Sequence, residues 1–268
     1  MTVNQISVFV ENKSGALAQI TAELSAGGVN MRALSIAETQ DFGVLRFIAD
    51  DEDRAAAVLE LYLGGQGVGE AADRLLFGEA NPSGHLAETF PLRLEDTPCY
   101  LSFPGSQKTV RYAEGVFTGY RYYDAKKAPV RWAFGHGLSY TSFRIDNLRV
   151  HGELDDDNAV EVTVEVTNTG ARFGKEVVQL YVSDGGLSPE RPVKELKGFA
   201  KLALEPGETR TAHFSLRARD LSYYEDRLHD WYAPSGEYAV LAGDASDHIT
   251  ATAPLRFTTK KAAPLSAA

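Results

Sequence analysis

Cysteine, long apolar runs and leader-like segments are all scarce in this sequence. Cys99 is the single cysteine among 268 residues, so the chain cannot form an internal disulfide or a zinc knuckle, and it fits a reducing compartment. No run of about 18 apolar residues is present, so we expect no membrane-spanning helix and no membrane partner. The opening residues MTVNQISVFVENKSG lack a basic stretch and a long apolar stretch, so we expect no secretory signal and a cytoplasmic location.

Basic residues are fewer than acidic residues in this chain. The chain carries 27 lysine and arginine residues against 37 aspartate and glutamate residues, which gives a net charge of -10. Nucleic-acid binding requires a basic stripe, so we expect no nucleic-acid partner. Hydrophobic residues make up 44% and charged residues 24%, which is ordinary for a globular protein and excludes global disorder. The length predicts about two domains or three small modules.

Metal-binding and phosphate-binding patterns are missing. The acidic run Asp155–Asp157 lacks the spaced ligands of a calcium loop and is interpreted as a solvated turn. The stretch Gly64–Gly69 matches neither phosphate-binding glycine pattern and is interpreted as a loop that enters a helix. No two histidines lie two or four residues apart, so we expect surface or loop histidines, no metal site and no cofactor. The histidines are His85, His136, His151, His213, His229 and His248.

The first block of the chain, residues 1–59, alternates strand and helix patterns. Short apolar alternations predict strands, and apolar residues at helical spacing predict the segments between them. Gly27 and Gly28 end the first helix pattern, and the acidic start of the second complements a helix dipole. The predicted strands are Ile6–Val10, Met31–Ala37 and Val44–Ile48, and the predicted helices are Ala16–Leu24 and Asp51–Leu63.

The middle block, residues 60–140, is rich in glycine, proline and aromatic residues. A helix is predicted from Glu70 to Phe77, with Ala71, Leu75 and Leu76 on its buried side, and mostly loop beyond Gly78. A segment of this length with so little periodicity depends on a neighbouring layer, and without one it exposes an apolar patch. The aromatic residues concerned are Tyr100, Phe103, Tyr112, Phe117, Tyr120, Tyr122, Tyr123, Trp132 and Phe134.

The last block, residues 141–259, has an all-β pattern. Val160, Val162, Val164 and Val166 alternate with polar residues, and the same alternation returns at 178–182. Turn residues recur at spacings that suit a β-sandwich. We expect three bulky aromatic residues to contribute to its core, and a fraying tail at 260–268. The aromatic residues are Trp231, Tyr232 and Tyr238.

Paired carboxylates are the remaining route to hydrolytic chemistry. Glycosidic cleavage requires one carboxyl as acid and a second as nucleophile or base. The middle block offers Glu79, Glu88, Glu114 and Asp124, and Glu114 lies among aromatic residues that can stack on a sugar. The alternative is that Glu114 is a loop carboxylate paired with Arg111 or Arg121. Catalytic residues stay unassigned, with Glu114 as candidate and with Tyr112, Tyr120 and Arg121 as candidate carbohydrate contacts.

The middle and last blocks resemble the C-terminal end of family 3 glycoside hydrolases, the β-glucosidase and β-xylosidase group. The resemblance spans about residues 60–250 and implies that 60–140 is the C-terminal fragment of an (α/β)6 sandwich domain. It also implies that 141–259 is the immunoglobulin-like, fibronectin type III-like β-sandwich that follows. The motifs that carry it are LLFGEANPSGHL at 75–86, EGVFTGYRYYD at 114–124, FGHGLSYT at 134–141, GKEVVQLY at 174–181 and ELKGF at 195–199.

The same resemblance bears on catalysis. The family nucleophile is an aspartate in a barrel, and the family acid/base glutamate lies upstream of the stretch that aligns with Gly64. Neither region is expected within these residues, so the resemblance implies a truncated or fused hydrolase-like protein without catalysis of its own. An alternative is a hydrolase subunit that acts on β-glucosides or β-xylosides together with a separate barrel chain.

Residues 3–59 resemble an ACT domain, a small amino-acid-sensing module of ferredoxin-like βαββα type. The motifs are QISVFVEN at 5–12, GAL at 15–17 and GVNMRALS at 28–35. The resemblance implies a regulatory module that binds a small amino acid, or a saccharide, and an open sheet edge that forms a homodimer. The predicted fold class is therefore a multi-domain chain of α+β and all-β parts. The implied ligand loop comprises Asn12, Ser14, Gly15, Leu17 and Asn30.

Overall fold

The computed structural model divides the chain into two compact units, Met1–Ala80 and Asn81–Ala268. Each unit is described by itself, because their relative placement is not determined. The residues that the structure describes are 6–11, 22, 31–38, 42–49, 60, 62, 65–105, 108–188 and 191–262.

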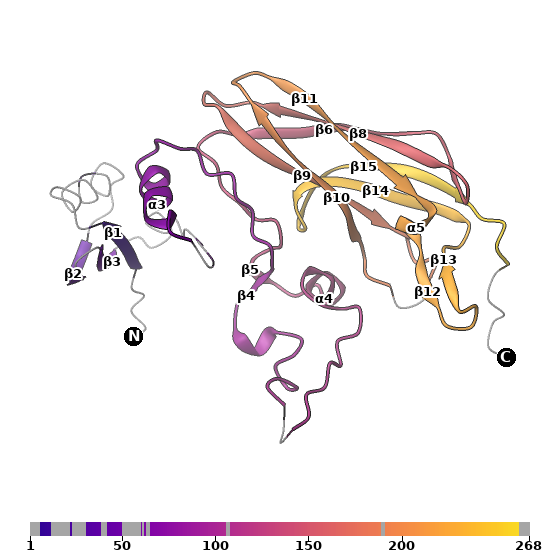
Figure 1. The fold of residues 1–268 in the computed structure, drawn as a ribbon, viewed down its shortest axis with the longest axis horizontal. Helices are drawn as coiled ribbons and strands as arrows, with labels where there is room; N and C mark the ends of the chain where they lie inside the picture. Colours follow the sequence, from indigo (N-terminus) through magenta and orange to yellow (C-terminus); the bar gives the residue numbers. More distant parts are fainter. Residues whose placement is uncertain are drawn as a thin grey trace. The chain divides into compact units, whose positions relative to one another are not determined.

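The first unit contains a three-stranded antiparallel sheet (Figure 1). Its middle strand pairs with both others, with Phe47 opposite Ile6 and Ala49 opposite Met31. The strand order is β1-β3-β2, so β1 and β2 form the two edges. The three predicted strands are confirmed, whereas the two predicted helices of this block lie almost wholly outside the described residues. The strands are β1 Ile6–Glu11, β2 Met31–Glu38 and β3 Phe42–Ala49.

Helix α3, Val68–Leu76, follows the glycine-rich stretch as predicted. Glu70 in the first turn and Arg74 in the last turn both complement the helix dipole. The prediction of its buried side was wrong: Ala71 is exposed and the Leu76 side chain is 45% exposed. A helix of nine residues buries its apolar face only where a second layer covers it, and the described part of this unit provides none over those two residues.

The second unit begins with a segment of short elements, residues 81–140. Strands β4 (Phe90–Pro91) and β5 (Val130–Trp132) pair with each other, and a 3-10 turn, η1, spans Leu94–Asp96. Helix α4, Tyr120–Lys126, was not predicted, because its aromatic residues have modest helix propensity. Tertiary contacts hold it instead: the Tyr120 ring lies 5.2 Å from Phe134 and 5.8 Å from Tyr181 of the sandwich.

The rest of the second unit is a two-layer β-sandwich, as predicted (Figure 1). One sheet has the order β10-β9-β14-β15-β7, and the facing sheet has the order β11-β8-β6. A small hairpin, β12 with β13, follows the short helix α5. The bounds are β6 Phe143–His151, β7 Leu154–Asp155, β8 Ala159–Asn168, β9 Gly174–Ser183, β10 Glu195–Leu204, β11 Thr209–Arg217, α5 Ala218–Leu221, β12 Tyr223–Glu225, β13 Asp230–Tyr232, β14 Gly236–Ala245 and β15 His248–Thr258.

The core lies between the two sheets and follows the period-2 pattern of the sequence. Val162, Val164 and Val166 of β8 are fully buried, and their neighbours on the strand point outward. Tyr232 and Tyr238 are buried as predicted, but the prediction for Trp231 was wrong. Trp231 is 39% exposed because it shares the outer face of the β12–β13 hairpin with Tyr224.

Among the residues that the structure describes, no helix combines the length and the apolarity needed to cross a membrane.

Candidate functional site

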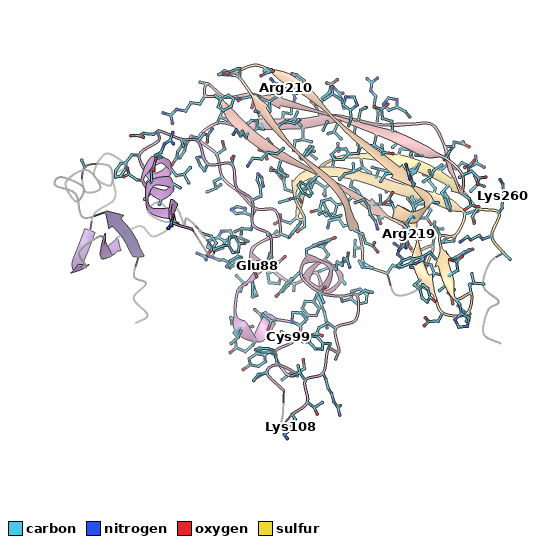
Figure 2. All side chains as sticks on the ribbon, viewed as in Figure 1. Glu88, Cys99, Lys108, Arg210, Arg219 and Lys260 are labelled. Carbon is cyan, nitrogen blue, oxygen red and sulfur yellow. The ribbon has the colours of Figure 1, made fainter. Side chains whose placement is uncertain are left out.

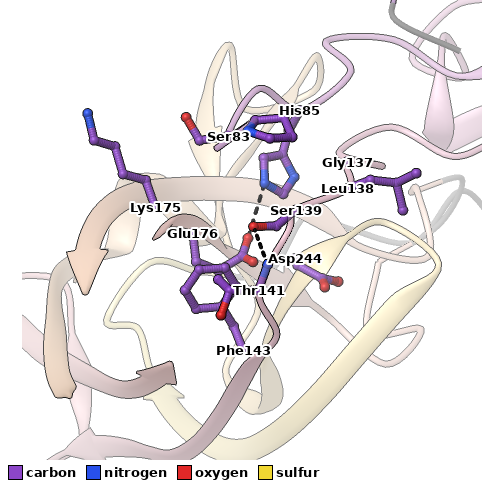
Figure 3. Close-up of a pocket in the computed structure, with 11 residues that line it drawn as sticks. Ser83, His85, Gly137, Leu138, Ser139, Thr141, Phe143, Lys175, Glu176 and Asp244 are labelled. Atoms are coloured by element: carbon purple, nitrogen blue, oxygen red, sulfur yellow. Dashed lines mark hydrogen bonds and ion pairs between the residues drawn. The ribbon is translucent and has the colours of Figure 1, made fainter. Parts of the chain in front are cut away.

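A cavity of about 230 Å³ lies where the first segment of the second unit meets the sandwich (Figure 3). Its walls come from the chain before β4, from the connection between β5 and β6, and from strands β9 and β14. Its lining combines charged, hydroxyl-bearing and apolar side chains. The lining residues are Pro82, Ser83, His85, Gly137, Leu138, Ser139, Thr141, Phe143, Lys175, Glu176 and Asp244.

Backbone hydrogen bonds between two distant segments form one wall of the cavity. The Leu86 N–H donates to the His136 carbonyl at 2.9 Å, and the Gly135 N–H donates to the Leu86 carbonyl at 2.8 Å. Gly135 has a φ of +89°, and a Cβ there would lie 2.2 Å from the Gln179 side chain. Only glycine therefore lets the chain pass this close to β9.

Asn81 fastens the same wall to the sandwich. Its side-chain oxygen accepts hydrogen bonds from the Ser139 hydroxyl at 2.9 Å and from the Tyr140 N–H at 2.8 Å. Its side-chain amide donates to the Phe173 carbonyl at 2.9 Å. One side chain thus joins the start of the unit, the entry to β6 and the entry to β9.

His85 and Glu176 form an ion pair inside this site. The His85 Nε2 lies 3.1 Å from Glu176 Oε1, and its Nδ1 lies 2.5 Å from the Gly135 carbonyl oxygen. The two side chains are 13% and 9% exposed. Burial by itself lowers the pKa of His85, but the hydrogen bonds to Glu176 and Gly135 and the charges of Glu176 and Asp244 outweigh it. The pKa of His85 is therefore raised above its ordinary 6.5.

Two carboxylates line the cavity, and each is held by a histidine. Glu176 pairs with His85, and Asp244 Oδ1 lies 2.6 Å from His248 Nδ1 on the same hairpin. A catalytic acid must be free to protonate the leaving oxygen, whereas a carboxylate that accepts from a histidine is committed to its partner. The arrangement therefore has the chemistry of a structural charge network.

The position of Glu176 on its strand could have marked it as a residue with a special partner. Val178, Leu180 and Val182 mark the inward face of β9, and two residues earlier the same face carries Glu176. A carboxylate at a core position of a strand requires a buried partner. That partner, His85, is 91 residues away in the sequence, and only the fold brings the two together.

The candidate carboxylates of the middle block lie in different surroundings, and a catalytic role for any of them stays a prediction. Glu88 is exposed, Glu79 lies in the other unit beside Arg74 at 3.8 Å, and Glu114 is half-buried on a loop. Glu114 lies on a loop, as the alternative expected, but none of the ion pairs among the described residues joins it to Arg111 or Arg121. Its own carbonyl closes the local turn by accepting from the Phe117 N–H at 3.0 Å.

Of the four candidate carboxylates, Asp124 forms a mostly buried ion pair. Its Oδ2 lies 2.5 Å from Lys194 Nζ, and both side chains are mostly buried, at 18% and 10% exposure. Burial raises the pKa of the Asp124 carboxyl above its usual 3.8, although the Lys194 ammonium counteracts that shift. Asp124 therefore anchors α4 to the connection between β9 and β10, and it does not line the cavity.

The predicted carbohydrate contacts lie apart from the cavity. The Tyr112 side chain is 90% exposed, and the Tyr120 hydroxyl accepts a hydrogen bond from the Leu196 N–H at 2.8 Å. The Arg121 guanidinium lies 5.9 Å from the Tyr120 ring. None of the three lines the cavity, and their role in carbohydrate binding stays a prediction.

Other predicted features have these outcomes. The Asp155–Asp157 run is a turn, because Asp155 Oδ1 accepts from the Asp157 and Asn158 N–H groups. The described residues contain no group of three or more potential metal ligands. The prediction of surface or loop histidines holds for His213 and His248, which are exposed, and for His85, which lies on a loop although its side chain is mostly buried. The implied ligand loop, with Asn12, Ser14, Gly15, Leu17 and Asn30, lies outside the described residues.

Family models match three parts of the chain. Residues 1–69 match the ACT domain pair, residues 42–140 match the glycosyl hydrolase family 3 C-terminal domain, and residues 176–246 match the fibronectin type III-like domain. The family 3 match begins within the first unit and ends where the sandwich begins, and the fibronectin type III-like match lies within the sandwich. The chain therefore contains, in this order, segments similar to an ACT domain pair, to the family 3 C-terminal domain and to a fibronectin type III-like domain.

Particular relatives are family 3 enzymes. The thermostable beta-glucosidase B of Acetivibrio thermocellus is 50% identical over 198 residues, which cover 74% of this chain and 26% of that protein. An exo-alpha-(1->6)-L-arabinopyranosidase of Bifidobacterium longum is 41% identical, also over 74% of this chain and 26% of its own length. The chain therefore spans about a quarter of the length of the curated relatives it matches.

Two solved structures of beta-glucosidases are similar to most of this chain. The GH3 beta-glucosidase of Bifidobacterium adolescentis superposes with a TM-score of 0.70 at 41% identity, over 74% of this chain and 29% of that chain. Beta-glucosidase 3B of Thermotoga neapolitana gives 0.68 at 35% identity, over 74% and 27%. The likeness therefore concerns the C-terminal part of these enzymes.

Proposed function

We propose that residues 60–259 act as the non-catalytic C-terminal part of a hydrolase for β-linked glucosides or xylosides. In this proposal 60–140 complete an (α/β)6 layer and 141–259 form the supporting sandwich. The 268-residue chain by itself then turns over no glycoside. The observation that carries the proposal concerns two of the mostly buried carboxylates: Glu176 and Asp124 are each paired with a basic side chain.

The chemistry of the reaction supports this reading. Acetal hydrolysis requires two carboxyl groups about 5–10 Å apart across one sugar, with one of them protonated. Glu176 accepts from His85, and Asp124 accepts from Lys194. Removing either carboxylate from its partner leaves a buried cation without compensation, so these groups serve the fold.

Turnover by the purified chain tests the proposal. Release of nitrophenol from aryl β-glucosides and aryl β-xylosides is expected to stay at the level of the buffer. The matched variant is Glu114→Gln, which removes the catalytic candidate without changing its size. Turnover by the unmodified chain that Glu114→Gln abolishes would overturn the proposal and assign the chemistry to Glu114.

A mixing experiment separates the two forms of the proposal. If a separate barrel chain supplies the catalytic carboxylates, activity appears only when both chains are combined. A related beta-glucosidase that lacks the segment matching residues 60–259 provides a defined partner. Activity restored by the 268-residue chain supports a hydrolase subunit, and an inert mixture contradicts that form.

A further inference from the structure

Both ring nitrogens of His85 face acceptors, and this fixes their protonation in the folded state. The Gly135 carbonyl, 2.5 Å from Nδ1, can only accept, so Nδ1 carries a proton. Glu176 Oε1, 3.1 Å from Nε2, also accepts the hydrogen bond of the Val177 N–H at 2.8 Å. A carboxylate oxygen in that position accepts again from Nε2 only if Nε2 carries a proton too. The geometry is that of an imidazolium.

The ring is one of several links between the short-element segment and the sandwich, beside those made by Asn81, by Lys201 and by the Asp124–Lys194 pair. His85 belongs to the chain before β4, Gly135 follows β5, and Glu176 belongs to β9 of the sandwich. Figure 3 shows the ring above Glu176 at the edge of the cavity. Loss of the Nε2 proton would place a nitrogen lone pair against a carboxylate oxygen with no hydrogen between them.

We propose that His85 is a pH-sensitive joint: as an imidazolium it fastens residues 81–86 and 133–137 to β9, and on deprotonation it releases them. The open cavity beside the pair gives water access to Glu176 when the contact opens. Release loosens the wall that carries the Leu86 and Gly135 hydrogen bonds and leaves the sandwich core intact.

The surrounding charges favour the imidazolium. Glu176 on β9 and Asp244 on β14 both raise the pKa of His85, although Asp244 is shared with His248. Lys175 lines the same cavity. Lys201 of β10 donates to the Ser83 carbonyl at 2.7 Å, and burial followed by the charge of Lys175 lowers the pKa of Lys201 below its usual 10.5.

The sign of the effect follows from linkage. The folded-state pKa of His85 lies above the ordinary 6.5, so the stabilisation from the ion pair is complete below pH 6.5. It is lost as the pH rises through the folded-state pKa. The joint is therefore closed in mildly acidic solution and opens toward alkaline pH.

Two measurements on the complete chain test the joint. Titration of the histidine ring resonances by NMR is expected to give a midpoint above 6.5 for His85. Hydrogen exchange of the Leu86 and Gly135 amides, corrected for intrinsic rates, is expected to lose on the order of tenfold protection between pH 6 and 8.5. Amides of the β8–β11 ladder serve as the internal control and keep their protection.

Variants distinguish a pH-sensitive contact at His85 from one whose role is only structural. Glu176→Gln is expected to lower the His85 midpoint and to shift the loss of amide protection to lower pH. His85→Lys keeps a positive charge throughout and is expected to remove the pH dependence while protection stays high. A His85 midpoint at or below 6.5 in the unmodified chain, or unchanged amide protection between pH 6 and 8.5, would overturn the proposal.

Discussion

At the scale of single residues, Gly135 shows how closely the two parts of the second unit approach. Its φ of +89° lies in the region that side chains avoid, and three atoms of Gln179, Asp244 and Ala245 lie within 2.9 Å of the place a Cβ would occupy. Two of these atoms are backbone, so they cannot turn aside. Glycine at position 135 is therefore a steric requirement of this close approach.

Gly135→Ala is expected to destabilise the second unit by about 3 kcal/mol, the sum of backbone strain and clash. Gly207 is the matched control, because its φ is +76° and nothing lies within 4 Å of a Cβ built there. Gly207→Ala is expected to cost about 1 kcal/mol, from strain alone. Urea denaturation followed by circular dichroism measures both. Equal losses in the two variants would show that the close approach contributes nothing.

At the scale of secondary-structure elements, α4 depends on its neighbours more than on its sequence. Gly119 caps its start, Lys127 caps its end in the left-handed conformation, and Tyr123 is its buried residue. Its Asp124 reaches Lys194, and its Tyr120 contacts Tyr181 of β9. Seven residues are too few for a stable isolated helix, so these contacts hold it. The same contacts attach the short-element segment to the sandwich.

Lys194→Met is expected to destabilise the second unit by about 3 kcal/mol at neutral pH, because it leaves the Asp124 carboxylate mostly buried and unpaired. Since such a carboxyl has a folded-state pKa above the usual 3.8, the loss grows as the pH rises from about 4 and is smallest in acid. The double variant Lys194→Met/Asp124→Asn is expected to recover part of the stability. Urea midpoints at pH 4 and pH 7 measure this. A loss independent of pH, with no recovery in the double variant, would contradict it.

At the scale of the whole molecule, apolar exposure is concentrated in the segment between η1 and α4. Leu101 is 97% exposed, Tyr112 90% and Phe103 69%. Lys108 lies at the far end of this segment, and Cys99 lies near its base (Figure 2). Of the aromatic residues expected to form an apolar patch, Tyr100, Phe103 and Tyr112 are exposed, whereas Tyr123 is buried. Such patches favour association.

The purified chain is expected to self-associate with rising concentration, and trypsin is expected to cleave first near Lys108 and Arg111. The double variant Leu101→Gln/Phe103→Gln is expected to reduce association several-fold without changing the denaturation midpoint, since both side chains are exposed. Phe199→Gln is the control, because Phe199 is equally exposed but lies on β10. Light scattering and mass spectrometry of the digest provide the readouts. Uniform resistance across residues 64–135, or an equal effect of Phe199→Gln, would contradict this prediction.

Much of the fold could be predicted from local pattern. The alternation of Val160 to Val166 determined which face of β8 is buried, since side chains on a strand alternate between its two faces. The same reasoning failed for Trp231 and for the apolar face of α3. In both cases burial depends on whether another element covers that face, and a periodicity does not contain this information.

The candidate site was predictable only in part. The motifs at 75–86, 134–141 and 174–181 contain most of the residues that line the cavity, yet no pattern within them joins His85 to Glu176. Nor does any pattern join Asp124 to Lys194. Each pair is separated by 70 residues or more, so proximity comes from the folded chain.

The sequence by itself determined the strand faces, the order of the three blocks and the kinship with family 3 hydrolases, because short-range periodicity and ordered motifs are properties of the linear chain. Only the tertiary structure decided which charges meet in the interior and which aromatic rings stay in contact with water. Desolvation and pairing depend on distances in space, and these distances exist only once the sheets have packed.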